Sequence, residues 1–211
     1  MTTRQSWYGV FFKGIRIWAR LILFTSGFRV AKVTPVAFDR SENYMFIANH
    51  TSILDILLMI VITKNPFVFV GKKELGKIPL FGFFYKRTCI LVDRSSVKSK
   101  TNAFRIAQQR IKLGLSICIF PEGLVPDDPT VVLSDFKGGA FHLAIAHQLT
   151  IVPMTFLDCK RRLPYVFFKG GPGTLRVRMH PFIKTSHMDA SMVSNLKQHC
   201  FDLLYSDLTS N

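Results

Sequence analysis

Short apolar runs alternate with segments of helical periodicity along most of this chain, and no other feature constrains its fold as strongly. The runs are rich in β-branched and aromatic residues, as buried strands are. They are YMFIA at 44–48, FVFVG at 67–71, CILVD at 89–93, SICIF at 116–120 and TIVPMTF at 150–156. Helical patterns occupy 52–63, 96–113, 136–147 and 189–208. This alternation predicts an α/β fold, with a mixed sheet flanked by helices.

Two further segments have an extended character. RVAKVTPVAF, at 29–38, predicts an extended segment that carries Pro35 at the edge of a sheet. GGPGTLRVRMHPFI, at 170–183, predicts a turn and then an exposed strand, with Arg176 and Arg178 on one side. We find no internal repeat and no linker. We therefore expect a single catalytic domain, residues 29–211, preceded by an N-terminal helical element, residues 1–28.

The N-terminal segment SWYGVFFKGIRIWARLILFTSGF, at 6–28, predicts an amphipathic helix. Its longest run without charge, 21–28, is far shorter than the roughly 20 residues of a membrane-spanning helix. On a helix, three cations share one stripe and an aromatic-rich apolar sector lies opposite. The cations are Lys13, Arg16 and Arg20, and the apolar residues are Phe11, Ile15, Trp18 and Ile22. The pattern is typical of a helix in a membrane interface, and the alternative is a helix packed on the core.

The charge balance points to anionic partners. The chain has 28 Lys and Arg against 13 Asp and Glu, a net charge of +15. Nucleic acid, an anionic lipid surface and an acidic carrier protein would all be attracted to such a field. The phenylalanines lie mostly in core-like runs and no nucleic-acid-binding signature occurs, so we expect no nucleic acid partner. The rival class is a basic, non-catalytic module that binds lipid headgroups or nucleic acid. The four cysteines lack metal-ligand spacing, and no metal site is predicted.

A histidine and an aspartate five positions apart, His50 and Asp55, follow the predicted strand 44–48. They can meet if His50 lies in the loop before the helix and Asp55 on its second turn, with Thr51 or Ser52 as the N-cap. A carboxylate on one imidazole nitrogen fixes the tautomer and makes the other nitrogen a general base. The alternative is a capping polar residue and a solvated aspartate.

Other charged residues follow further predicted strands, at the sheet edge where α/β folds place their sites. Glu122 and Gly123 come just after the strand at 115–120, and Arg94 follows the strand at 89–93. Lys137 precedes a glycine pair at a helix start, where amides and a cation suit an anion. An arginine at such an edge can hold a phosphate with two hydrogen bonds. The alternatives are a charged turn, a local Asp93–Arg94 surface pair and an ordinary helix entry.

Four short blocks resemble the glycerolipid acyltransferase family, the group that includes the 1-acylglycerol-3-phosphate acyltransferases. Asn49-His50 through Asp55 is similar to its NHxxxxD block, and Val92-Asp93-Arg94 resembles the second block. Phe120-Pro121-Glu122-Gly123 and Ile151-Val152-Pro153-Met154 resemble the third and fourth. The order and the rough spacing agree over residues 44–154. Four blocks in order are far more specific than any one of them.

The resemblance implies an enzyme that moves an acyl group from acyl carrier protein or acyl-CoA to a lysophospholipid hydroxyl, without a cofactor. It implies His50 as the general base and Asp55 as its orienting partner. It assigns Arg94, Glu122 and Gly123 to acceptor binding, and we add Lys72 and Lys137 as nearby cations. The family's N-terminal membrane-docking helices match the segment 6–28. We expect a peripheral, monotopic protein on the inner, cytoplasmic leaflet of the cell membrane.

One departure from the family pattern bears on the acceptor. The third block of the family continues Gly-Thr-Arg, and its arginine is tied to the acceptor phosphate, whereas this chain continues Leu124-Val125-Pro126-Asp127-Asp128. Either another cation holds the phosphate or the acceptor has none, as in a lyso-aminolipid. The candidate cations are Arg94, Lys72, Lys73, Lys77, Arg87 and Lys137. A serine hydrolase is excluded because no Gly-x-Ser-x-Gly elbow occurs.

Overall fold

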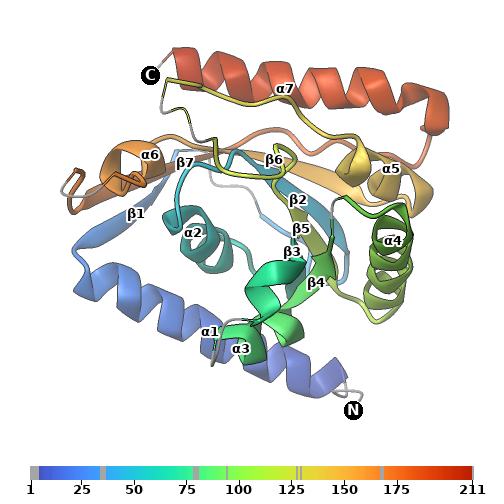
Figure 1. Cartoon of the computed structure of the whole chain (residues 1–211), viewed down its shortest axis with the longest axis horizontal. Helices are drawn as coiled ribbons and strands as arrows, with labels where there is room; N and C mark the ends of the chain where they lie inside the picture. The colour runs from blue at the N-terminus through green and yellow to red at the C-terminus, as the bar shows by residue number, and fades with distance from the viewer. Residues whose placement is uncertain are drawn as a thin grey trace.

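A seven-stranded mixed sheet forms the centre of the protein, as the computed structural model shows for residues 5–33, 37–77, 81–93, 95–126, 128, 130–166 and 169–210. The strands are β1 (Phe28–Lys32), β2 (Tyr44–Ala48), β3 (Phe67–Lys72), β4 (Cys89–Val92), β5 (Ser116–Ile119), β6 (Thr150–Phe156) and β7 (Gly173–Met179). Their order is β1-β7-β6-β2-β5-β3-β4 (Figure 1). Neighbours are parallel except β6 and β7, which are antiparallel.

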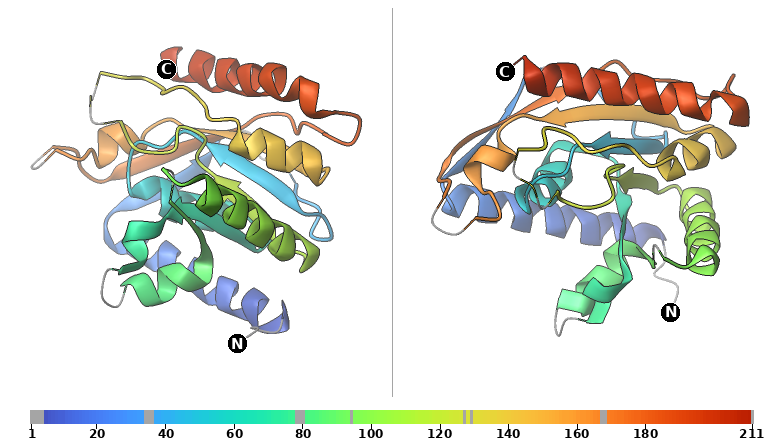
Figure 2. Two further views of the ribbon diagram at one scale, coloured as in Figure 1. Left: turned by 45° about the vertical axis from the view of Figure 1, so that its right-hand side comes forward. Right: turned by 45° about the horizontal axis from the view of Figure 1, so that its top comes forward.

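Helices cover both faces of the sheet, with α1 and α2 on one side and α5 and α7 on the other (Figures 1 and 2). The α-helices are α1 (Gln5–Thr25), α2 (Leu54–Ile62), α3 (Phe81–Thr88), α4 (Val97–Lys112), α5 (Gly139–Ala146), α6 (Cys159–Arg162) and α7 (Val193–Thr209). Two 3-10 turns are η1 (Lys73–Lys77) and η2 (Ala190–Met192). The layered α/β class with a mixed sheet is therefore confirmed.

The central strands are buried on both faces, which explains why apolar runs located them. β2 and β6 coincide with the predicted runs, and every residue of β2 is buried. Three short helical elements, η1, α3 and α6, were not predicted. Each has at most eight residues, too few for a helical period to stand out from the flanking glycines, prolines and charges. Pro35, predicted at a sheet edge, lies outside the described residues.

β7 corrects one prediction, because it is an interior strand and not an exposed one. It lies between β1 and β6, and Leu175, Val177 and Met179 are buried on one side. Arg176 and Arg178 do share the other side, but each is bound to a carboxylate, Arg176 to Asp158 and Arg178 to Asp207. The two alternating arginines suggested an exposed strand, because the sequence did not show which acidic residues would pair with them.

The N-terminal helix α1 packs on the core with one face and exposes a second apolar face. Tyr8, Phe12, Ala19 and Leu23 are buried, and the Tyr8 hydroxyl donates to the Phe67 carbonyl at 2.8 Å. A second arc, the outer face of α1, is exposed. It comprises Trp7, Val10, Ile17, Trp18, Leu21 and Phe24. No helix among the described residues is long and apolar enough to cross a membrane.

The predicted faces of α1 are only partly correct. Trp18 is exposed, but Phe11, Ile15 and Ile22 are half-buried against the protein. Arg16 does not border the outer face, because its guanidinium donates to the Lys64 carbonyl at 2.8 Å beyond the end of α2. Apolar side chains therefore cover two faces of α1. One face packs on the core and the other is exposed.

Helix α2 supports the loop that precedes it, and its burial can be tested. Leu58 is fully buried, so Leu58→Ala leaves a cavity and should lower the free energy of unfolding by about 2–5 kcal/mol. Val97, at the exposed start of α4, is the matched control, and Val97→Ala should change stability by less than about 0.5 kcal/mol. Urea unfolding measures both. Equal losses would contradict the packing of α2 described above.

Candidate active site

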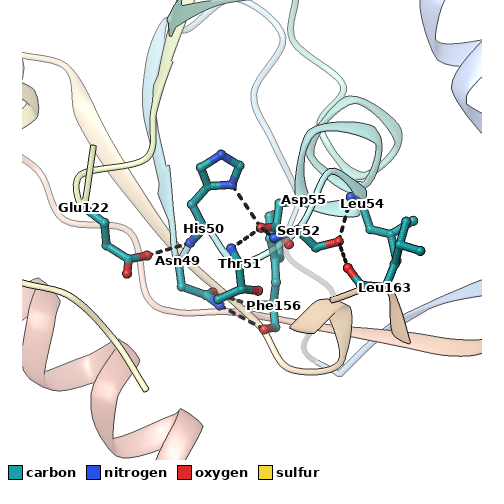
Figure 3. Close-up of polar contacts among 9 residues, drawn as sticks. All are labelled: Asn49, His50, Thr51, Ser52, Leu54, Asp55, Glu122, Phe156 and Leu163. Atoms are coloured by element: carbon teal, nitrogen blue, oxygen red, sulfur yellow. Dashed lines mark hydrogen bonds and ion pairs between the residues drawn. The ribbon is translucent and has the colours of Figure 1, made fainter. Parts of the chain in front are cut away.

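His50 and Asp55 form a bonded pair in the loop between β2 and α2. The imidazole Nδ1 lies 3.0 Å from Asp55 Oδ2, and the His50 side chain is 17% exposed whereas that of Asp55 is fully buried (Figure 3). A carboxylate partner places the proton on Nδ1 and leaves Nε2 as an acceptor. The other ring nitrogen points away from the surrounding polar contacts in Figure 3. The arrangement therefore leaves Nε2 available as a hydrogen-bond acceptor.

Asp55 also holds the backbone of this loop. Its Oδ2 accepts the N–H groups of Thr51 at 2.5 Å and Ser52 at 2.8 Å. Asp55 lies in the first turn of α2, not the predicted second, because the helix begins at Leu54. A carboxylate there is favoured by the positive end of the helix dipole. One oxygen thus connects the imidazole, two amides and the helix start.

The predicted N-cap at Thr51 or Ser52 is wrong. Ile53 occupies the cap position without a side-chain hydrogen bond. Ser52 instead joins α2 to another loop, since its hydroxyl donates to the Leu163 carbonyl at 2.7 Å and accepts from the Leu54 N–H at 3.2 Å. The hydroxyl is thus shared between α2 and the end of α6.

Glu122 lies on the opposite side of the His50 loop from Asp55 (Figure 3). Its carboxylate accepts the His50 backbone N–H at 2.6 Å and the Ser134 N–H at 2.8 Å, and the residue is only 2% exposed. Burial raises the pKa of Glu122, and the hydrogen bonds from Ser134 and His50 oppose that shift. The geometry supports a positioning role, with both oxygens already occupied by the protein.

The imidazole ring is fixed by aromatic stacking as well. Phe120 is nearly parallel to the His50 ring, with ring centroids 4.2 Å apart and an interplanar angle of 13°. Phe69 follows behind Phe120 at 6.1 Å. Such stacking restricts rotation of the imidazole about its side-chain bonds. Phe120 was quoted only as part of a motif, and sequence reasoning gave no sign of this contact.

Asn49 joins the start of the loop to β6, and its role was also missed. The side-chain amide donates to the Phe156 carbonyl at 3.1 Å and accepts the Phe156 N–H at 2.8 Å. Asn49 is buried, so both bonds are shielded from water. The amide continues the pairing of β2 with β6 past the last strand residue. The clue in the sequence was an amide directly before His50.

The turn after β6 is itself held by charge. Asp158, which precedes α6, is buried and accepts three hydrogen bonds from Arg176 and one from Arg161. Burial alone would raise the pKa of Asp158, but its bonds to Arg176 and the two positive charges lower it overall. Through Leu163 and Ser52, this network gives the His50 loop a second support.

Two of the predicted acceptor-binding residues, Gly123 and Lys137, lie together. Gly123 has a φ of +87°, and the Lys137 Nζ atom lies 3.0 Å from the position that a Cβ on Gly123 would occupy. The Lys137 N–H donates to the Pro121 carbonyl at 2.9 Å, which holds the two segments together. A Cβ at 123 would move the flexible lysine by only a few tenths of an ångström, so glycine is needed here for its φ.

Two predicted acceptor-binding residues remain, Lys72 and Arg94. Lys72 is the exposed last residue of β3, at the same edge of the sheet as the His50 loop. Arg94 lies outside the described residues. Its neighbour Asp93 accepts the N–H and hydroxyl of Ser95 in a local turn. The missing arginine would stand at Val125, which is half-buried and follows the exposed Leu124. Among the described residues, no group of three or more histidine, cysteine or acidic side chains is arranged to hold a metal ion.

Comparisons with known proteins identify the family of this chain. A model of the family described as Acyltransferase matches residues 29–157. The 1-acyl-sn-glycerol-3-phosphate acyltransferase of Salmonella typhimurium is 31% identical over 180 residues, which cover 84% of this chain and 72% of the relative. The enzyme of the same name from Cocos nucifera is 29% identical over 167 residues, or 76% of this chain and 54% of the relative.

A solved structure shares the fold of the whole chain. The 1-acyl-sn-glycerophosphate (LPA) acyltransferase of Thermotoga maritima superimposes with a TM-score of 0.80, covering 100% of this chain and 83% of the other. Its sequence identity is 18%, so this likeness concerns the fold. The family model covers more than half of the chain and includes both His50 and Asp55. The chain therefore belongs to the Acyltransferase family.

Proposed function

We propose that the protein transfers a fatty acyl group from a thioester to the free hydroxyl of 1-acyl-glycerol-3-phosphate, giving phosphatidic acid. The observation that carries this proposal is the buried Asp55 bound to His50 Nδ1, with Nε2 left as an acceptor. The relatives named above, whose names state this activity, support the same reaction. The acyl thioester is a co-substrate, so the proposal includes no cofactor.

The proposed reaction is a direct transfer. His50 Nε2 accepts the proton of the acceptor hydroxyl while its oxygen attacks the thioester carbonyl carbon. When the tetrahedral intermediate collapses, the carbon–sulfur bond breaks and the thiolate takes the proton from the imidazolium. The Asp55 carboxylate stabilises that imidazolium and holds the ring. No bond forms between the protein and the acyl group. Glu122 acts by fixing the His50 backbone and not by contact with the reacting atoms.

The proposed cation for the acceptor phosphate is Lys137, assisted by Lys72. Lys137 Nζ lies against Gly123, and Gly123 directly follows Glu122, which accepts the His50 backbone N–H. The Lys137 ammonium can take the place of the arginine side chain that this chain lacks after Gly123. It binds phosphate as a point charge, whereas an arginine would bind it as a planar fork. Val125 in place of the arginine also favours a second candidate, an acceptor without phosphate such as a lyso-aminolipid.

We propose that residues 1–28 form a membrane-docking element on a catalytic domain of residues 29–211. The outer face of α1 supports this, because two tryptophans and four other apolar side chains are exposed there. Lys13 and Arg20 are exposed on the same helix and suit anionic headgroups. On this proposal the protein lies peripherally on the cytoplasmic leaflet of the cell membrane.

The catalytic proposal is tested by His50→Ala and Asp55→Asn. Each should lower kcat by about 10²–10⁴-fold, because the first removes the base and the second removes the charge that orients it. Transfer of labelled palmitate from palmitoyl-CoA or from palmitoyl-acyl carrier protein to 1-acyl-glycerol-3-phosphate measures the effect. His199→Ala, exposed on α7, is the control. An undiminished rate in folded His50→Ala would favour a non-catalytic binding module.

The acceptor proposal is tested with an acceptor panel of 1-acyl-glycerol-3-phosphate, monoacylglycerol and a lyso-aminolipid. Lys137→Met should raise KM for the phosphate acceptor by about tenfold or more, since a hydrogen bond to a charged group is lost, and should leave the others unchanged. Lys137→Arg should restore binding, and Lys184→Met, at an exposed lysine elsewhere, is the control. Faster acylation of the lyso-aminolipid, with no effect of Lys137→Met, would establish the second candidate instead.

The membrane proposal is tested by charge on the outer face of α1. Deleting residues 1–28 would also remove Tyr8 and Phe12 from the core, so point changes are cleaner. Trp18→Glu with Phe24→Glu should abolish sedimentation with anionic vesicles. A charged side chain at either position opposes insertion of the outer face of α1 into the bilayer. Tyr205→Glu, at an exposed aromatic on α7, is the control. Retained vesicle binding by the folded double variant would exclude this face as the anchor.

A further inference from the structure

An open groove of about 740 Å³ lies between α4, α5 and the segment that leads into α7. α5 and α7 cover the face of the sheet opposite α1 (Figures 1 and 2). The groove is therefore separate from the outer face of α1, and none of the residues proposed above to act in catalysis or acceptor binding lines it.

The walls of the groove are apolar, and small residues leave space along them. Phe104, Ile145 and Val193 line it, and Phe104 is exposed although it is a large aromatic. Gly139, Ala146 and Ala190 lie among them. Proteins that bind an amphipathic helix in a groove use an apolar surface of this kind between two helices.

The rim of the groove is cationic. Lys100 and Arg105 line it and are exposed, and His142 lies on the α5 side. α4 as a whole has five cations and no acid in its 16 residues, VKSKTNAFRIAQQRIK. No acid is among the residues that line the groove, and Asp189, which precedes Ala190 in the sequence, accepts hydrogen bonds from the N–H and hydroxyl of Ser191. The groove therefore favours a partner that is acidic as well as apolar.

The groove also begins close to the candidate active site. Gly139, in its wall, is two residues from Lys137, and Lys137 lies against Gly123. Gly123 follows Glu122, which binds the His50 amide. A partner seated between α4 and α5 would thus lie beside the edge of the sheet at which His50 is presented.

We propose that this groove binds an acidic amphipathic helix of the soluble protein that carries the acyl thioester. This proposal rests on the acyl transfer proposed above and names the donor as protein-borne. A membrane lipid is the less suitable occupant, because the exposed apolar surface suited to a bilayer lies on α1, on the other side of the sheet. A free acyl chain would gain nothing from the cationic rim.

The experiment compares one palmitoyl thioester on two carriers, acyl carrier protein and N-acetylcysteamine, the second having neither protein nor phosphate. Lys100→Glu with Arg105→Glu should lower kcat/KM about tenfold or more for the protein-borne donor, because two attractive charges become repulsive at its docking surface. The same pair should change the small thioester less than about twofold. Lys98→Glu with Lys112→Glu, which makes the same charge change on α4 outside the groove, is the matched control and should have little effect.

Anisotropy of fluorescently labelled acyl carrier protein, without lipid, gives a second measurement. Wild-type protein should bind it and release it as salt is raised, and the groove pair should not bind it. Equal losses for both donors, equal losses for the groove and control pairs, or no use of the protein-borne donor by wild-type protein would each overturn the docking proposal. Loss of vesicle binding in the groove pair, with both donors unaffected, would show a membrane contact instead. Transfer from the small thioester by the wild-type protein would leave the proposed acyltransferase activity standing in every one of these cases.

Discussion

The buried carboxylate of Asp55 is the interaction on which the candidate site depends. A charged group with no access to water is costly unless donors converge on it. Here one oxygen receives the imidazole of His50 and the amides of Thr51 and Ser52. The same bonds that compensate the charge also set the loop conformation. The orientation of the imidazole and the stability of the loop therefore have one physical cause.

A second carboxylate holds the other side of His50. Glu122 binds the histidine through its backbone, whereas Asp55 binds it through its ring. The turn after β5 presents Glu122, and helix α2, which follows β2, presents Asp55. His50 is therefore held between segments that follow two neighbouring strands of the sheet. Asn49 adds a third connection, to β6. The imidazole is presented by a frame in which each support comes from a different strand or helix.

Much of the fold could be predicted because buried strands leave a continuous apolar signal. β2 and β6 matched the apolar runs, and the meeting of His50 with Asp55 followed from a loop before a helix. The position of β7 between two strands could not be predicted, since its arginines are neutralised by Asp158 and Asp207, which lie 18 and 29 positions away in sequence. Ring stacking by Phe120 and the two bonds of Asn49 depend on distances that only the folded chain shows. Spacing in sequence locates groups that are close along the chain, and it does not show which side chains from distant strands meet.

The two apolar faces of α1 have a consequence for how the acceptor reaches His50. One face belongs to the core, where Tyr8 binds the carbonyl of Phe67 at the start of β3. Helix α1 is therefore part of the packed domain and not a flexible linker. With its outer face in the bilayer, as proposed, the height of the imidazole above the lipid is set by the rigid packing of α1 and α2. A lysolipid would then have to rise out of the leaflet by a fixed amount, and its own chain length would decide how much of it stays behind.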